Sequence, residues 1–489
     1  MKNKLKLASI IFVLLIAGLL RCYRLDNPIG DWHAFRQADT SAVSKVFVEN
    51  GINPLTPKYF DISNIQSGKD NPEGYRFVEF PIFNVFQAGL YSTVGVFSLE
   101  VWGRLLSIVA SLLTILFIYL LVKKKLNYLS AIFASFFYAV LPFSVYYGRV
   151  ILPDPSTAMA ILGGIYFFDN FLSEKTKSKS HFSAVKTYSF LATAILFTAS
   201  AFLLKPFALF FTLPMVYLAW NEFKLKAFLK WELYVFAILS VIPLVFWRIW
   251  ITQYPEGVPV SNWLFNEGNI RFTGAYFHWI FADRLGRLIL GYFGIVLLIL
   301  GLFKKDEKNY YFFVSFLVSS LAYVVVIARG NVQHDYYQIL ILPTICIFLG
   351  RGASQLLSLP VQLGKNLQTN TIVAGASLIA ITFFSLFFSW YYVRDYFNIN
   401  NRALVTAGVI ADRVLPKNAK VIAANEGDTS FLYYINRQGW PAYEKSPEEL
   451  KLMGATHIVI QSPTQKDKDG LGKQFKRAYS TPEVLILKL

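Results

Sequence analysis

The sequence predicts a polytopic α-helical membrane protein that carries a small α/β domain at its C-terminus. Of its 489 residues, 55% are hydrophobic and only 16% are charged, whereas roughly 25% of residues are charged in a typical soluble domain. The apolar residues form long blocks with almost no charge, such as residues 7–20, 105–122 and 372–392. Blocks of about 20 residues match the hydrocarbon core of a bilayer. We therefore do not expect a water-soluble globule.

The net charge of +17 is compatible with two kinds of partner, nucleic acid or a membrane. Basic residues of membrane proteins gather at the cytoplasmic ends of the helices. The lysines follow that rule, because they cluster in every second loop between the apolar blocks. Three such clusters are Lys2, Lys4 and Lys6; Lys123, Lys124 and Lys125; and Lys224, Lys226 and Lys230. The expected partners are therefore membrane lipids, and no nucleic acid is expected.

Holding the lysine clusters inside predicts about eleven transmembrane helices with a cytoplasmic N-terminus. The spans are expected near residues 7–22, 101–122, 129–147, 155–172, 187–204, 207–220, 232–251, 285–303, 310–328, 338–350 and 371–392. An odd number of spans places the C-terminus outside. The extracytoplasmic segments are then 23–100, 148–154, 205–206, 252–284, 329–337 and the tail from residue 393.

The sequence divides into a transmembrane domain over residues 1–392 and an extracytoplasmic α/β domain over residues 393–489. The long first outer loop, 23–100, shows a helical pattern that ends at Gly51, and a second amphipathic stretch over 80–97 that is typical of a re-entrant or interfacial helix. Residues 60–79 are rich in Asp, Asn, Gly and Pro and are expected to form a loop.

The tail is predicted to alternate strands and helices, because charges become frequent and apolar runs shorten beyond residue 400. Strands are expected at 421–424, 457–460 and 484–487, and helices at 402–414 and 447–453.

The densest polar group follows the first span, at residues 30–40. It holds candidate site residues of several types, namely Asp31, His33, Arg36, Gln37 and Asp39. A transfer reaction from a phosphate-linked donor needs a carboxylate to accept a proton and cations to stabilise the phosphate. Asp39 or Asp31 fits the first role and Arg36 the second. The alternative is structural: Asp39 caps a helix that begins at Thr40 and pairs with Arg36.

Two further groups lie at outer turns, where charge at the bilayer edge is costly and usually faces a cavity. Arg149 and Asp154 flank one turn, and Asp154 stands between two prolines, so its alternative role is a helix N-cap. Lys205 lies in the shortest outer turn and fits a phosphate, although snorkelling to the membrane surface is an equal explanation.

The last candidate group, in the outer turn 329–337, contains His334, Tyr336 and Tyr337. Tyrosines are common interfacial anchors, and a lone histidine is weak evidence for catalysis or a metal. All the candidate groups fall on the same predicted side of the membrane. We therefore expect one aqueous cavity to collect them.

Four motifs together resemble the GT-C membrane glycosyltransferases, and within them glycosyltransferase family 39, which is related to protein O-mannosyltransferases and lipid A aminoarabinose transferases. The resemblance covers about residues 5–350. The motifs are His33-Ala34-Phe35-Arg36-Gln37-Ala38-Asp39-Thr40, Arg149 with Leu152-Pro153-Asp154, Leu204-Lys205-Pro206-Phe207, and His334-Asp335-Tyr336-Tyr337.

The resemblance implies an inverting glycosyltransferase of the bacterial inner membrane that uses a polyprenyl-phosphate sugar donor. The acceptor would be an extracytoplasmic glycan, lipid or protein. Asp39 is then the first choice for the base and Asp31 the second, and Arg36, Lys205 and Arg149 bind phosphate. The remaining candidates would line the substrate site: His33, Gln37, Asp154, His334, Tyr336 and Tyr337.

The sequence departs from the family in one respect. Better-known members have an Asp-Glu pair in the first loop, whereas this chain has Arg36-Gln37 before Asp39. The identity of the base is therefore left open between Asp39 and Asp31. Some members use a divalent cation there, so the resemblance leaves that cofactor open as well.

Two other classes of protein fit parts of the sequence. A transporter or a flippase of lipid-linked sugars also has many spans and buried ionisable groups, but it tends to show repeated halves and charges at mid-membrane. A membrane anchor that presents the α/β domain to a partner would leave the polar outer loops unexplained.

Overall fold

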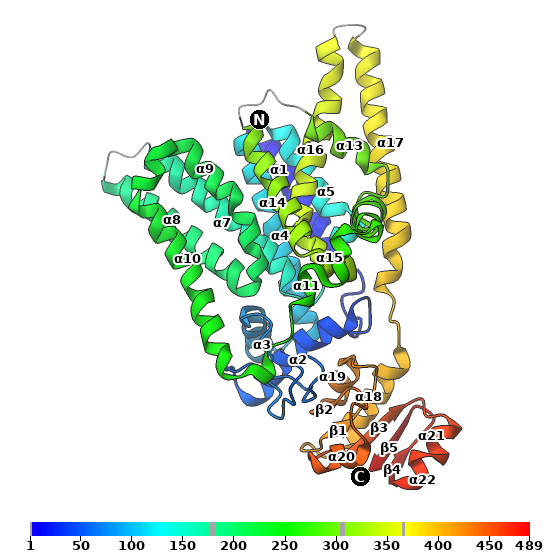
Figure 1. The fold of residues 1–489 in the computed structure, drawn as a ribbon. Coiled ribbons are helices and arrows are strands. Elements are labelled where there is room, and N and C mark those ends of the chain that lie inside the picture. The colour runs from blue at the N-terminus through cyan, green and yellow to red at the C-terminus, as the bar shows by residue number, and fades with distance from the viewer. Residues whose placement is uncertain (1, 177–180, 304–308, 364–366) are drawn as a thin grey trace. The chain divides into compact units, whose positions relative to one another are not determined.

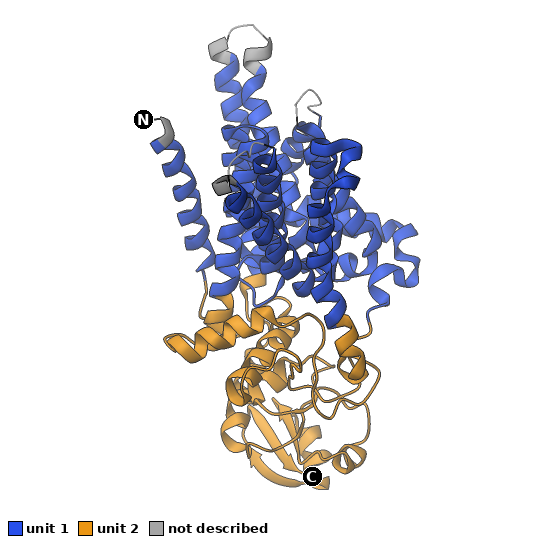
Figure 2. Ribbon diagram, turned by 90° about the vertical axis from the view of Figure 1, so that its left-hand side faces the viewer, with its two compact units in different colours: residues 1–23, 105–247, 261–395 blue, residues 24–104, 248–260, 396–489 orange. Residues whose placement is uncertain are grey.

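The computed structural model describes residues 2–176, 181–303, 309–363 and 367–489, which are mostly helical (Figure 1). Contacts divide the chain into two compact units, and each is assembled from separate stretches of sequence (Figure 2). Unit 1 comprises residues 1–23, 105–247 and 261–395. Unit 2 comprises residues 24–104, 248–260 and 396–489.

Unit 1 is entirely helical over the residues that the structure describes. Its elements are α1 (Lys2–Arg21), α4 (Leu99–Lys125), α5 (Tyr128–Val140), α6 (Pro142–Tyr147), α7 (Asp154–Lys175), α8 (His181–Leu204), η1 (Pro206–Thr212), α9 (Leu213–Phe223), η2 (Lys224–Leu229), α10 (Trp231–Trp250), α11 (Trp263–Asn266), η5 (Glu267–Phe272), α12 (Gly274–Phe277), the π-helix η6 (His278–Ile289), α13 (Gly294–Leu302), α14 (Tyr310–Val326), α15 (Ala328–Gln333), η7 (Asp335–Leu340), α16 (Leu342–Leu363), α17 (Leu367–Val393) and η8 (Arg394–Phe397). Three of these helices, α4, α10 and η8, extend into unit 2 at one end.

Five helical segments among the described residues are long and apolar enough to cross a membrane. They are Leu99–Lys125, Ala184–Leu204, Trp231–Gln253, Leu342–Leu359 and Asn370–Val414. A bent pair, Gly274–Ile289 with Gly294–Leu302, brings the number to six if it counts as one span. The predicted number of about eleven spans stays a prediction.

Several predicted single helices are broken in the structure. The segment predicted over 285–303 bends by 114° between η6 and α13. Gly291 allows this bend, because it has a φ of +49° and a Cβ there would lie 2.0 Å from the carbonyl oxygen of Ser385. The segment 129–147 divides before Pro142, and 207–220 divides into η1 and α9. A proline inside a helix removes one backbone hydrogen bond, which accounts for the first of these two breaks.

Glycines bring α16 close to two neighbouring helices of unit 1. A Cβ on Gly350 would lie 2.4 Å from the backbone nitrogen of Ala134 in α5, and one on Gly352 would lie 1.8 Å from the carbonyl oxygen of Leu297 in α13. Small residues allow such backbone contact between helices in membranes, where packing drives helix association. These two glycines therefore hold α16 between α5 and α13.

Unit 2 contains a five-stranded sheet with the strand order β2-β1-β3-β5-β4. Strand β1 is parallel to β2 and β3, and β5 is antiparallel to β3 and β4. Its elements are α2 (Ala34–Asn50), α3 (Ile82–Val94), η3 (Ile251–Gln253), η4 (Pro255–Gly257), α18 (Arg402–Val414), β1 (Val421–Ile422), α19 (Ser430–Ile435), β2 (Gly439–Trp440), α20 (Pro447–Leu452), β3 (His457–Gln461), α21 (Gln465–Asp469), α22 (Leu471–Gln474), β4 (Lys476–Ser480) and β5 (Val484–Lys488).

The first outer loop is built into this sheet. The backbone of residues 60–62 pairs with the edge strand β2, because the amide of Ile62 donates to the carbonyl of Gly439 at 3.0 Å and the amide of Gly439 donates to the carbonyl of Phe60 at 2.9 Å. The side chain of Ile62 lies in the same core as Ile422 and Ile458. The tail and the first loop therefore fold as one unit, and the predicted boundary at residue 393 stays a prediction.

Shortening Ile62 tests this joint core. The substitution Ile62→Ala should lower the free energy of unfolding by about 2–4 kcal/mol, because it removes buried methyl groups from a packed core. Amide hydrogen exchange of β1 and β3 in the full chain, measured by mass spectrometry in detergent, should become at least about 30-fold faster, the equivalent of 2 kcal/mol. The matched control is Ile52→Ala, because Ile52 is 46% exposed. Equal protection in the two variants would contradict the joint core.

Candidate active site

The polar group after the first span forms the start of α2, six residues earlier than the Thr40 start considered above. The helix begins at Ala34, and His33 precedes it with a φ of +56°. Left-handed conformations are uncommon for residues other than glycine and are worth attention near a site. Because the helix starts early, Asp39 lies inside it, and the interpretation of Asp39 as an N-cap is wrong.

Asp39 is buried in an ion pair. Its Oδ2 accepts from Nη2 of Arg76 at 2.6 Å, and its Oδ1 accepts from the hydroxyl of Thr429 at 2.6 Å. Asp39 is only 3% exposed. The predicted pairing with Arg36 is therefore also wrong, because Arg76 takes that place. The carboxylate joins α2 to the first loop and to the start of α19.

Arg36 is held by a different acid, Glu79. Its Nη2 lies 2.7 and 2.8 Å from the two carboxylate oxygens, and both side chains are nine-tenths buried. Asp31 is fully buried, and its Oδ1 accepts from Nε2 of Gln37 at 2.6 Å. Four of the predicted residues thus lie close together at the start of α2. Sequence reasoning missed Arg76, Glu79 and Thr429, because their partners are 37, 43 and 390 residues away.

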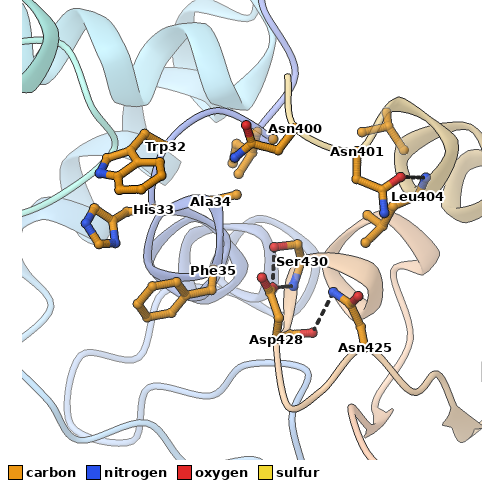
Figure 3. Close-up of a pocket in the computed structure, with 13 residues that line it drawn as sticks. Trp32, His33, Ala34, Phe35, Asn400, Asn401, Leu404, Asn425, Asp428 and Ser430 are labelled. Carbon is orange, nitrogen blue, oxygen red and sulfur yellow. Dashed lines mark hydrogen bonds between the residues drawn. The ribbon is translucent and has the colours of Figure 1, made fainter. Parts of the chain in front are cut away.

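A cavity of about 280 Å³ opens beside the start of α2 (Figure 3). Trp32, His33 and Phe35 line it from the first loop, and Asn400, Asn425 and Asp428 are among the polar residues that line it from the C-terminal part. Asp428 accepts hydrogen bonds from the amide and the hydroxyl of Ser430. Burial raises the pKa of Asp428 above its usual range. No spacing in the sequence indicates a role for this carboxylate.

In unit 1, Lys205 and Asp154 form a buried ion pair. Pro206 ends α8 and holds Lys205 in an extended conformation, outside any helix. Its ammonium group contacts Oδ1 of Asp154, the first residue of α7. Lys205 is 8% exposed and Asp154 is fully buried. The side chain of Asp154 does not cap α7, so its alternative role as an N-cap is wrong. The side chain of Lys205 is paired with Asp154 and does not extend to the membrane surface, so snorkelling is wrong as well.

Aromatic side chains surround this pair. The ammonium group of Lys205 lies 4.8 Å from the ring centre of Tyr337 and 5.4 Å from that of Tyr336. The ring of His334 stacks on that of Tyr336 at 5.2 Å. Cations are attracted to aromatic faces, so the two tyrosines add to the stability of the buried lysine.

Two more charged groups of unit 1 are buried near the same helix ends. Arg149 is fully buried and donates from Nη1 to the carbonyl of Tyr23 at 3.1 Å. The hydroxyl of Tyr147 donates to Oδ1 of Asp335. The expectation that one cavity collects all candidate groups stays a prediction, because they divide between the two units.

The described side chains do not fit a divalent cation. No three His, Cys, Asp or Glu residues among them stand together as a ligand set, and hard cations prefer several oxygen ligands. Asp39, the first-choice base, is already paired with the guanidinium group of Arg76. The chemistry below therefore uses no metal.

Solved structures of two kinds share this fold. The chain is similar to ArnT from Cupriavidus metallidurans in the apo state, with a TM-score of 0.67 and 11% identity over 98% of this chain and 97% of that one. It is also similar to the apo oligosaccharyltransferase of Archaeoglobus fulgidus, with a TM-score of 0.60 and 11% identity over 95% and 70% of the two chains. A third match is AglB of that organism in complex with an inhibitory peptide and a dolichol-phosphate, with a TM-score of 0.59 and 11% identity over 96% and 70%.

A family model described as dolichyl-phosphate-mannose-protein mannosyltransferase matches residues 80–247. That stretch contains Arg149, Asp154 and Lys205. No curated protein sequence matches the chain. The family match over this stretch and the shared fold confirm the resemblance to GT-C membrane glycosyltransferases found in the sequence.

The buried acid Asp61, which lies near Asp39 and Arg76, predicts a pH dependence of stability. Burial raises the pKa of Asp61 to about 6, whereas that of an unfolded Asp is about 3.9. The folded protein therefore binds the proton more tightly, and the free energy of unfolding should fall by about 3 kcal/mol as the pH rises from about 4 to about 6.

Thermal unfolding of wild type and Asp61→Asn between pH 4 and pH 7 checks this sign. The variant lacks the contribution of Asp61, so its free energy of unfolding should fall less than that of wild type over this range. An unchanged slope in the variant would show that Asp61 does not titrate in this range.

Proposed function

We propose that the chain is an inverting glycosyltransferase that moves a sugar from a polyprenyl-phosphate donor to an acceptor on the extracytoplasmic side of a bacterial inner membrane. The observation that carries this proposal is the buried pair of Lys205 and Asp154, which lies within the segment matched by the mannosyltransferase model. Ionisable groups inside apolar helices are costly and usually serve a ligand or a transport path. AglB has been solved with a dolichol-phosphate, and we propose a lipid phosphate of that kind, carrying a sugar, as the donor for this chain.

In unit 1, the donor phosphate would bind to Lys205 and Arg149. Asp154 holds the ammonium group in place, because its carboxylate compensates a charge that would otherwise be buried without a partner. Tyr336, Tyr337 and His334 would line the region around the phosphate. A cation held in advance stabilises the charge that develops on the leaving phosphate without reorganising during the reaction.

In unit 2, either Asp39 or Asp31 would act as the base. Both are buried and hydrogen-bonded, Asp39 to Arg76 and Thr429, and Asp31 to Gln37. Asp39 would have to exchange one of its partners for the acceptor hydroxyl. Arg36 would bind phosphate only by leaving Glu79, and His33 and Gln37 would contact the substrate or orient the acids.

The transfer would follow a single displacement. The acceptor oxygen bonds to the anomeric carbon of the donor as its proton passes to the carboxylate. The bond between the anomeric carbon and the phosphate oxygen breaks on the opposite face, and polyprenyl phosphate leaves with the electron pair. The configuration at the anomeric carbon is therefore inverted.

Transfer of radiolabelled sugar by the purified full chain in liposomes tests this function. Loss of the base should lower turnover by about 10²- to 10⁴-fold, so one of Asp31→Asn and Asp39→Asn should be nearly inactive. The matched control is Asp469→Asn, because its side chain is 48% exposed. Since Asp39→Asn also breaks a buried ion pair, the thermal stability of each variant is measured in parallel.

Two outcomes would contradict the proposal. Label that crosses the bilayer still attached to its lipid would identify a flippase. Full turnover by both acid variants, each correctly folded, would exclude both residues as the base.

A further inference from the structure

The cavity of about 280 Å³ in unit 2 has the features of a binding site (Figure 3). Three separate stretches of chain line it, within residues 29–35, 400–405 and 425–430. Its volume is close to the lower end of the roughly 300–1,000 Å³ range of small-molecule sites. A cavity of this size holds a single ring better than a long lipid tail or a folded peptide segment.

One side of the cavity presents a fixed aromatic surface. The ring of Trp32 stacks on that of Tyr396, with ring centres 4.8 Å apart and planes 16° from parallel. The backbone amide of Trp32 also donates to the carbonyl of Tyr396 at 3.0 Å. The indole is still 40% exposed. A large ring that is held in place but left open to solvent offers a flat apolar surface with little entropy left to lose on binding.

Other parts of the lining carry polar groups with unused hydrogen-bonding capacity. Three groups make no hydrogen bond with any of the described residues: the side-chain amide of Asn400, the side-chain oxygen of Asn425 and Oδ2 of Asp428. The other oxygen of Asp428 takes both hydrogen bonds from Ser430, which fixes the direction of the carboxylate. Together these groups supply both donors and acceptors for a ligand.

The lining of the cavity favours a neutral ligand over a phosphate. None of its 13 lining residues, all of which the structure describes, is Lys or Arg, and Asp428 is its acid. An anionic group would meet repulsion from the carboxylate of Asp428, and no permanently charged side chain in the lining compensates it. Neutral hydroxyl groups suit the amides and the carboxylate, and an apolar ring face suits Trp32.

We propose that this cavity binds a neutral sugar ring of the acceptor, which makes the acceptor a glycan. The role of this sugar as part of the acceptor rests on the glycosyltransferase function proposed above. The binding of a sugar in this cavity does not depend on that function. The aromatic surface would receive the C–H face of the ring. Asn400, Asn425 and Asp428 would bond to its hydroxyl groups.

Saturation-transfer NMR on the full chain in detergent, without donor, tests this site. The probes are three neutral trisaccharides, built from mannose, from glucose and from N-acetylglucosamine. The monosaccharide mannose is a fourth probe, which shows whether the site prefers a glycan to a free monosaccharide. At least one trisaccharide should bind, and more tightly than mannose. Trp32→Ala and Asn400→Ala should each weaken binding roughly tenfold, the value of one good contact.

The matched control is Asn50→Ala at the exposed end of α2, which should bind as wild type does. Binding of none of the trisaccharides, or binding that neither pocket variant weakens, would overturn the proposal, as would mannose binding as tightly as every trisaccharide. Because no donor is present, the result is independent of turnover. If the chain binds a sugar but transfers none, the sugar-binding site is supported and the proposed glycosyltransferase activity is contradicted.

Discussion

The structure of unit 1 depends on the need to pair charges that are buried among apolar helices. Removing one partner from a buried ion pair typically costs 3–5 kcal/mol, because the other charge is left without compensation. Lys205 and Asp154 satisfy this constraint across 51 residues of sequence. Each stands at a helix boundary, Lys205 after α8 and Asp154 at the first residue of α7, where the backbone leaves room for a polar side chain. The positive end of the α7 dipole also favours the carboxylate. The two adjoining helices, α7 and α8, are thereby fixed at the ends that carry the pair.

The same constraint organises unit 2. Asp39 with Arg76 and Arg36 with Glu79 are two buried ion pairs that join one face of α2 to the first outer loop. Thr429 connects Asp39 to the C-terminal part of the chain. Residues 60–62 extend the sheet at its edge and complete its core. The first loop and the tail therefore need each other, although almost the whole transmembrane part separates them in sequence.

Local patterns allowed much of the fold to be predicted, because they depend on neighbouring residues. The helix over 402–414 has the predicted bounds, and α2 ends before Gly51. The strands near 421, 457 and 484 are present, whereas the short β2 and the exposed β4 carry no clear apolar signal. The bend at Gly291 was missed because it depends on close contact with Ser385.

The site was predicted by residue type but not by pairing. Asp39, Arg36, Asp154 and Lys205 were all singled out, yet none of their three ion pairs was predicted: Asp39 with Arg76, Arg36 with Glu79, and Asp154 with Lys205. A capping role for Asp39 and Asp154 is a local rule, and tertiary contacts overrode it at both positions. The cavity beside Trp32 combines segments that lie hundreds of residues apart, so no spacing in the sequence indicates it.

Binding of polyprenyl phosphate, measured as a shift in thermal unfolding, tests the central claim most directly. The variant Asp154→Asn/Lys205→Met replaces the charged pair by neutral groups of similar size, so the fold should persist. Wild type should be stabilised by a saturating lipid, by about 2.7 kcal/mol at 100 times the dissociation constant, and the double variant should not be. Equal stabilisation of both proteins would contradict the claim that the buried lysine is held for a lipid-linked phosphate.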